Sequence, residues 1–297
     1  MACVLCVTYD VLHRSTIQLL RFHFSLFLLP VYLFAISQVP AVDRLRAALI
    51  FIILHLLVYP ASNGYNSYMD RDETPIGGLR APLQPTRQLF WATVLMDGVA
   101  IALSLIFINA FFALAVLAYI AASRAYSWRG LRLKRFPVTG FLTVFLFQGA
   151  WIYAAVALAF NKAAATGTSL LLPALAASCL VGALYPLTQI YQFEADRADG
   201  VTTISYKLGK RGSFLFSMLL FVAAAALLFG YFSAAGRLNH FYRFLVITLP
   251  VVGFFFYWMR KVWRNEAAAD FHHSLRMNLV ATACTTLYFL TLIYSNH

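Results

Sequence analysis

The feature that most constrains the fold is a succession of long apolar stretches. Each is long enough to cross the roughly 30 Å hydrocarbon layer of a bilayer as a helix. Hydrophobic residues make up 62% of the 297 residues and charged residues only 11%, so the apolar surface exceeds what one soluble core can bury. We therefore predict an all-α, polytopic membrane protein with about nine transmembrane helices around a central cavity, polar in part and apolar in part. The expected spans are 16–38, 42–60, 88–107, 109–125, 138–160, 169–190, 213–233, 241–259 and 275–295.

The spans predict one domain over residues 1–297 with a defined orientation. The residues before the first span lack the basic start and cleavage site of a signal peptide, so we expect this span to be retained. Basic residues gather in the segments that follow even-numbered spans, such as 129–135 and 260–264. Because such residues favour the cytoplasmic side, we predict a cytoplasmic N-terminus and a C-terminus on the opposite side.

The formal net charge of +12 has a simple explanation in this topology. Basic residues on the cytoplasmic side orient the chain and contact anionic membrane lipid, so we expect no nucleic-acid partner. Four cysteines form no disulfide or zinc framework, and the pair Cys3 and Cys6 alone is weak support for a metal site.

The acidic residues cluster in two short segments that resemble each other. The segments are YPASNGYNSYMDRDE (59–73) and YPLTQIYQFEADRAD (185–199), which follow the second and sixth spans. Five positions are identical and several more are chemically similar when the segments are aligned without gaps. We interpret this as an internal repeat four spans apart, which places both copies on the same membrane face. Pro60 and Pro186 predict that each helix is bent or broken at the start of its copy.

Within each copy, the spacing favours a metal site. An amide and two carboxylates recur at positions that share one face of a helix. Carboxylate oxygens suit Mg²⁺, which keeps several waters and is usually held by a few carboxylates together with substrate phosphate. Acids beside a membrane are costly unless a cation requires them. The residues are Asn66, Asp70 and Glu73 in the first copy, and Gln192, Asp196 and Asp199 in the second.

A basic segment, AYSWRGLRLKRFP, follows the fourth span on the same face. It contains Tyr126, Arg132 and Lys134. A cluster of cations beside a metal-bridged diphosphate would bind that group and stabilise charge as it leaves. The alternative is that these residues only orient the chain in the membrane.

Together these motifs resemble the UbiA superfamily of intramembrane prenyltransferases, and within it the 4-hydroxybenzoate polyprenyltransferase type. The family typically has N-x-x-x-D-x-x-x-D after helix two, a Y-S motif ending in R-L-K after helix four, and D-x-x-x-D-x-x-x-G after helix six. This chain follows that order but has Thr74 at the last acidic position of the first motif and Gln192 at the first of the third. Glu73 and Asp199 are the candidates to replace the missing charges.

The resemblance implies Mg²⁺-dependent transfer of a prenyl group from a prenyl diphosphate to a hydrophobic acceptor within the membrane. It implies catalytic roles for Asp70, Asp196 and Tyr126, and metal binding by Asp70, Glu73, Asp196 and Asp199. It implies diphosphate binding by Asn66, Arg132, Lys134, Arg21 and Gln192. The acceptor stays open between a quinone-precursor ring, a chlorin, a haem and another lipid.

Two alternatives remain at this level. A relative that binds prenyl diphosphate without catalysis is compatible with the departures at Thr74 and Gln192. An ion-coupled transporter also uses repeats, broken helices and membrane carboxylates, but it predicts acids deep within spans, where Asp97 alone lies. A membrane phosphoalcohol transferase is disfavoured because its D-G-x-x-A-R signature is absent from the sequence.

Overall fold

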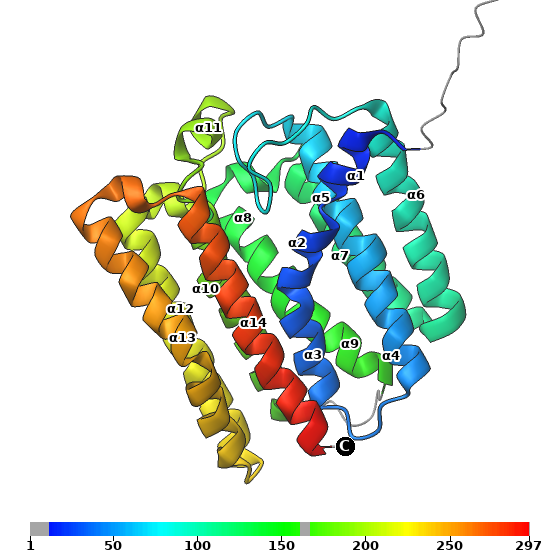
Figure 1. Cartoon of the computed structure of the whole chain (residues 1–297). Helices are drawn as coiled ribbons and strands as arrows, with labels where there is room; N and C mark the ends of the chain where they lie inside the picture. The colour runs from blue at the N-terminus through cyan, green and yellow to red at the C-terminus, as the bar shows by residue number, and fades with distance from the viewer. Residues whose placement is uncertain (1–11, 161–166, 297) are drawn as a thin grey trace, which may run out of the picture.

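The computed structural model describes residues 12–160 and 167–296, and these residues form an all-α protein (Figure 1). Within them, nine helices are long and apolar enough to cross a membrane, as the sequence predicted. The spans are Arg14–Ser37, Arg44–Asp70, Arg87–Ile108, Ala110–Ser127, Pro137–Phe160, Thr168–Thr188, Ile204–Ala234, Leu238–Arg264 and Phe271–Ser295. The pair Cys3 and Cys6 lies outside the described residues.

Several spans consist of more than one helical segment. The first four are built from α1 (Arg14–Leu20), α2 (Phe22–Ser25), η1 (Leu26–Leu28), α3 (Leu29–Ser37), α4 (Arg44–Phe51), η2 (Ile52–Val58), α5 (Tyr59–Asp70), α6 (Arg87–Leu103), η3 (Ser104–Ile108) and α7 (Ala110–Ser127). The remainder are η4 (Leu133–Arg135), α8 (Pro137–Val144), η5 (Phe145–Trp151), α9 (Ile152–Phe160), α10 (Thr168–Leu184), η6 (Tyr185–Thr188), α11 (Phe193–Ala198), α12 (Ile204–Ala234), α13 (Leu238–Arg264), η7 (Glu266–Ala268) and α14 (Phe271–Asn296).

Polar side chains determine where several helices begin. The side chain of Asp43 accepts hydrogen bonds from the backbone N–H groups of Leu45 and Arg46 and so caps α4. Asn109 accepts one from Phe112 at 2.8 Å and caps α7. The expected division of residues 88–125 at Asn109 is therefore confirmed, because the cap ends one span and starts the next.

The helices change their hydrogen-bonding pattern near the two repeat prolines. Residues 52–58 form a π-helical turn directly before α5, which has Pro60 in its first turn. Residues 185–188, which include Pro186, form a 3₁₀ turn at the end of α10. Proline has no N–H to donate to the preceding turn, so the regular ladder is interrupted at both places. The predicted interruptions are confirmed.

The spans pack through aromatic and small residues. One large cluster includes Phe34, Tyr153 and Phe289, and a second is built around Phe214 and Trp258. Elsewhere small residues let two helices approach closely, as is usual in membrane proteins. A Cβ atom added to Gly149 would lie 2.3 Å from Ser178 Cα, so spans five and six touch through backbone at this point.

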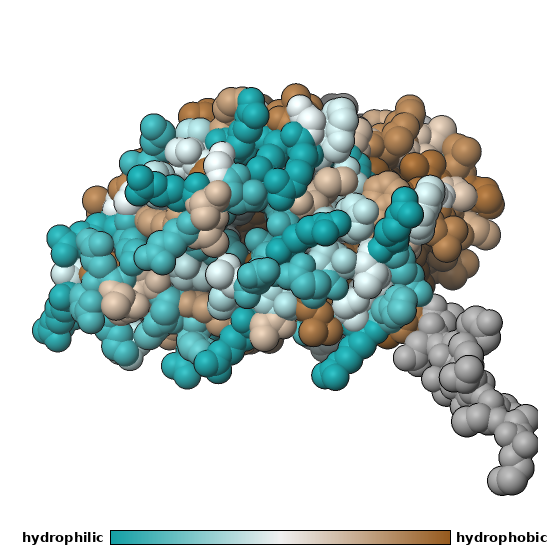
Figure 2. Space-filling model, turned by 90° about the horizontal axis from the view of Figure 1, so that it is seen from above, coloured by the Kyte–Doolittle hydropathy of each residue, from teal (hydrophilic) through white to brown (hydrophobic). Residues whose placement is uncertain are grey.

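One end of the bundle is polar. Figure 2 looks onto this end, where hydrophilic residues surround a central hollow. The end lies near α1 and α11 in Figure 1, and α14 finishes at the opposite end. Below the hollow, a cavity of about 280 Å³ enters the bundle between spans one, two, four, five, six, seven, eight and nine. The expectation of a central cavity, polar in part and apolar in part, is confirmed.

Candidate active site

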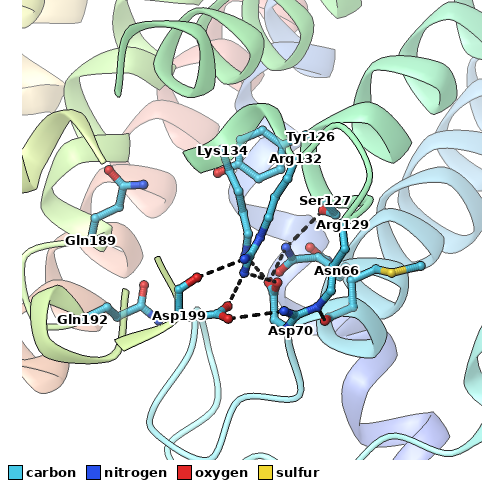
Figure 3. Close-up of polar contacts among 12 residues, drawn as sticks. Asn66, Asp70, Tyr126, Ser127, Arg129, Arg132, Lys134, Gln189, Gln192 and Asp199 are labelled. Atoms are coloured by element: carbon cyan, nitrogen blue, oxygen red, sulfur yellow. Dashed lines mark hydrogen bonds and ion pairs between the residues drawn. The ribbon is translucent and has the colours of Figure 1, made fainter. Parts of the chain in front are cut away.

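The end of α5 forms the first side of the polar mouth of this cavity. Asn66 donates hydrogen bonds through Nδ2 to Asp70 Oδ2 at 2.8 Å and to Ser127 Oγ at 3.1 Å. The first contact joins consecutive helical turns, and the second joins span two to span four (Figure 3). The Asp70 carboxylate is therefore held in place by its own helix and its neighbour.

The segment after span four supplies cations to the same carboxylate. Lys134 Nζ contacts Asp70 Oδ2, and Arg132 Nη2 lies 3.7 Å from Asp70 Oδ1 (Figure 3). Arg132 is the residue directly before η4 and has a left-handed backbone conformation, with φ of 48°. The basic segment therefore lies beside the first acidic motif, on the same face of the bundle, as expected from the sequence.

Arg132 mainly binds the second repeat copy. It pairs with the carboxylate of Asp199, and its Nη1 donates to the Asp199 backbone oxygen at 2.9 Å. Arg129 approaches the same carboxylate at 3.4 Å. Asp199 follows the last residue of α11 and does not line the cavity, although Figure 3 shows it close to Asp70. In this structure the role of Asp199 is to connect the two motifs through arginine.

Asp72 and Asp196 also line the cavity. Burial raises the pKa of Asp72 to about 6, and repulsion from Asp70 adds to this shift. Burial raises the pKa of Asp196 to about 7, against the opposing effect of Lys134. Two desolvated carboxyl groups that face one polar mouth are unfavourable as anions unless a cation joins them.

The expectation that Glu73 shares a helical face with Asn66 and Asp70 is wrong. The helix ends at Asp70, because Arg71 adopts a left-handed conformation with φ of 56°. In the irregular segment that follows, Asp72 lines the cavity whereas Glu73 is exposed and outside it. The helical periodicity used to choose Glu73 does not apply beyond the helix end, and this is why Asp72 was missed.

Arg21 lines the mouth from the first span. A left-handed residue with φ of 47°, it separates α1 from α2 inside the first span. Its side chain is buried, lines the cavity and donates to the backbone oxygens of Gly77 and Asn63 at 3.2 and 3.1 Å. Its Nε is buried and has no hydrogen-bond partner among the described residues, so it can still bind an anion.

Tyr126 on span four and Gln192 in the segment after span six both line the cavity. The Tyr126 hydroxyl is hydrogen-bonded to that of Tyr185 at 2.6 Å, and Gln189 donates to Tyr185 at 2.9 Å. Gln192 donates to the backbone oxygen of Pro75 at 3.0 Å, so the residue that departs from the family motif fastens the loop after span two. Tyr185 and Gln189 were not singled out from the sequence, although Tyr185 is the repeat partner of Tyr59.

The donor atoms at the mouth fit a hard divalent cation. Asp70 Oδ1 and Asp196 Oδ2 are buried without hydrogen-bond partners among the described residues. Among the residues that the structure describes, no three acidic, histidine or cysteine side chains form a ready-made metal cage. Mg²⁺ rarely uses an all-protein cage and completes its shell with water and phosphate, so open carboxylate oxygens around a shared space match its chemistry.

Fold and site together define an integral membrane protein with a carboxylate- and cation-lined mouth above a transmembrane cavity. The chain belongs to the UbiA prenyltransferase family, whose model matches residues 27–280. No curated protein matches it. The similarity to solved structures extends over nearly the whole chain.

A UbiA homologue from Archaeoglobus fulgidus bound to DMAPP and Mg²⁺ has a TM-score of 0.70 and 19% identity, over 94% of this chain and 99% of that chain. The apo structure of a UbiA homologue from Aeropyrum pernix K1 has a TM-score of 0.68 and 19% identity, over 91% and 98%. A structure of digeranylgeranylglyceryl phosphate synthase has a TM-score of 0.60 and 17% identity, over 95% and 97%. At these identities the shared property is the fold.

Proposed function

We propose that this protein is a Mg²⁺-dependent prenyltransferase that joins the prenyl group of a prenyl diphosphate to a hydrophobic acceptor. The observation that carries the proposal is the convergence of Asp70, Asp72 and Asp196 with Arg21 and Lys134 at the polar mouth of one cavity. Metal-bound diphosphate fits the mouth by charge, and a prenyl chain fits the apolar walls below. The A. fulgidus homologue bound to GPP and Mg²⁺ supports this assignment by family likeness.

Asp70, Asp72 and Asp196 are the proposed metal-binding residues. When bound, Mg²⁺ supplies electrostatic stabilisation of the diphosphate leaving group. Among the metal ligands expected from the sequence, Glu73 and Asp199 lie outside the cavity lining, and we assign their expected role to Asp72. Asn66 orients Asp70 through their hydrogen bond of 2.8 Å.

Lys134 and Arg21 are the proposed diphosphate-binding residues. Each presents cationic nitrogen to the cavity mouth, and each can neutralise negative charge that builds up on the diphosphate. Arg132 contacts the acidic motifs, so its proposed role is to hold Asp199 and the loop in place. The proposed role of Gln192 is also to hold a loop in place, because its amide donates a hydrogen bond to the backbone oxygen of Pro75.

The reaction follows from this arrangement. The allylic C–O bond of the donor breaks, its electron pair leaves with the diphosphate, and the cation-like carbon is attacked by the acceptor, which then loses a proton. Walls formed by Phe34, Val181 and Phe289 exclude water from that carbon. The hydroxyls of Tyr126 and Tyr185 are hydrogen-bonded at the upper part of the cavity, where their rings can face the developing positive charge.

The transporter alternative has little support. Asp97, the acid deep within a span, accepts a hydrogen bond from Arg124 Nε at 3.0 Å and belongs to a partly buried ion pair outside the cavity lining. A paired acid of this kind stabilises helix packing and does not form part of an ion pathway along the cavity.

Purified protein in detergent tests the proposal. Radiolabelled geranyl, farnesyl and geranylgeranyl diphosphates are first assayed for Mg²⁺-dependent binding and then for diphosphate release with a panel of aromatic and lipid acceptors. Binding with turnover supports the enzyme. Binding without turnover across the panel supports the non-catalytic relative, and absence of Mg²⁺-dependent binding overturns the proposal.

We further propose that the polar mouth faces the cytoplasm. The basic residues at this end follow the distribution expected of cytoplasmic segments, and α14 ends on the other side. Fusions of alkaline phosphatase and of green fluorescent protein to the C-terminus test this orientation. An active phosphatase and a dark fluorescent protein support it, and the reverse result contradicts it.

A further inference from the structure

A column of uncharged polar side chains descends from the mouth into the membrane interior. We call it the polar ladder. Its members come from spans two, four and five, and all of them line the cavity. They are Ser62 and Asn66 on α5, Tyr119, Ser123 and Ser127 on α7, and Gln148 in η5.

Hydrogen bonds join spans two and four at the two upper levels of the ladder. Below the contact from Asn66 to Ser127, one helical turn deeper, the hydroxyls of Ser62 and Ser123 are 2.5 Å apart. At the next level, the side chains of Ser62 and Gln148 neighbour the Tyr119 hydroxyl. The eight residues from Ser127 to Tyr119 correspond to a depth of about 12 Å. The ladder therefore reaches well below the charged groups that fit metal and diphosphate.

The walls of the cavity differ in chemistry at this depth. All charged side chains that line the cavity belong to the mouth: Arg21, Asp70, Asp72, Lys134 and Asp196. Other parts of the lining are apolar and include Val31, Phe34, Val181 and Phe289. Span nine adds Asn278, Thr282 and Thr285, and the side chains of Asn278 and Thr285 donate to the backbone of their own helix. An apolar prenyl chain matches the apolar side chains and does not use the polar groups of the ladder.

Polar groups inside a membrane are costly without a reason for their presence. Gln148 is half-buried and keeps amide hydrogen-bonding capacity beyond its contact with Tyr119. It is presented by a π-helical turn, a rare feature that is frequent at functional sites. The hydroxyl of Tyr59, one turn beyond Ser62 toward the membrane interior, is buried with no hydrogen-bond partner in the part of the chain that the structure describes.

We propose that the polar ladder binds the acceptor substrate through an uncharged hydroxyl or carbonyl group. This inference rests on the proposed prenyltransferase function and adds the chemical class of the second substrate. Hydroxyl and amide groups both donate and accept hydrogen bonds, so they match a phenol, an alcohol or a quinone-type carbonyl. A carboxylate or phosphate at the lower levels would be desolvated without a counter-charge, which excludes anionic groups there.

A pair of probes that differ by one hydroxyl tests the ladder. The affinities of 1-naphthol and naphthalene are measured by competition with a fluorescent naphthalene-type ligand, for the full chain in detergent with Mg²⁺ and geranyl diphosphate. The Gln148→Leu variant removes the amide, and Tyr119→Phe removes one hydroxyl if the first variant does not fold. Gln38→Leu is the matched control, because Gln38 accepts a hydrogen bond from Tyr231 away from the cavity.

The wild-type protein and the control should prefer 1-naphthol, and Gln148→Leu should reduce that preference about three- to tenfold, the effect of one hydrogen bond. Comparing variants cancels partition of the probes into detergent. A preference that is absent from the wild type, or unchanged in both ladder variants, overturns the inference. If the wild type does not bind geranyl diphosphate in the presence of Mg²⁺, the proposed function fails instead. The two failures are therefore distinguishable.

Discussion

Arg124 on span four donates a hydrogen bond through Nε to Asp97 on span three, and both residues lie within the membrane-spanning part of the bundle. Arg124 also donates to Thr93 at 3.2 Å and lies 3.9 Å above the ring of Tyr65, which neighbours Asn66 on span two. The Arg124 guanidinium thereby links span two, which carries Asn66, to spans three and four.

Removing one member of this ion pair should destabilise the protein strongly. Asp97→Leu leaves the Arg124 cation without its anion in a low-dielectric environment, which costs about 3–5 kcal/mol of unfolding free energy. The double variant Asp97→Leu with Arg124→Leu should be more stable than Asp97→Leu alone, because no unpaired charge remains. Thermal unfolding in detergent measures both, and a single variant as stable as the wild type would contradict the pairing.

Substitutions at neighbouring acids should separate Asp72 from Glu73. Asp72→Asn should reduce Mg²⁺-dependent donor binding at least about tenfold, because it removes a carboxylate that lines the cavity. Glu73→Gln is the matched control and should bind as the wild type does, since Glu73 is exposed outside the cavity. Titration with labelled geranyl diphosphate measures both affinities. Equal losses would show that the carboxylate next in sequence reaches the metal.

Mg²⁺ binding should strengthen as the pH rises through about 6 to 7. The pKa of Asp72 is raised to about 6 and that of Asp196 to about 7, so protons compete with the metal below these values. Calorimetry in buffers of different ionisation enthalpy should detect proton release on binding at about pH 6. Asp196→Asn should remove the upper part of this pH dependence, and pH-independent affinity in the wild type would argue against metal binding by these groups.

The same shifts set the sign of a stability effect in the metal-free protein. Both pKa values lie above the ordinary 3.8, so the folded state keeps protons that the unfolded chain has lost. Their contribution to folding is full below about pH 4 and is lost as the pH rises through about 7. Without Mg²⁺, unfolding temperature should therefore fall over this interval, and saturating Mg²⁺ should reverse the trend.

Packing between spans five and six should tolerate no added methyl group. Gly149→Ala places a Cβ atom 2.3 Å from Ser178 Cα, so the two helices must separate at a cost of about 1–3 kcal/mol. Gly253→Ala in α13 is the matched control, because no atom lies within 4 Å of the position that its methyl group would take. That control should be neutral or slightly stabilising, and equal stability of the two variants would contradict the close contact.

The residues at the mouth show how far local sequence patterns extend. Asn66 and Asp70 were placed correctly because they belong to one continuous helix, where spacing determines direction. Glu73 was predicted to line the site in place of Asp72, because the prediction continued the helix that the left-handed residue Arg71 ends. Asp199 was predicted to bind metal because the sequence does not show its contact with Arg132, which lies 67 residues away in the chain.

The amino-acid sequence by itself determined the nine spans and the end of the bundle where charge gathers, because hydropathy and helical spacing are local properties. Only the tertiary structure decided which carboxylates enter the cavity, which cations pair with which carboxylates, and where the polar ladder lies. These depend on backbone direction after each helix end and on contacts between distant spans, and neither is encoded in the spacing of any one segment.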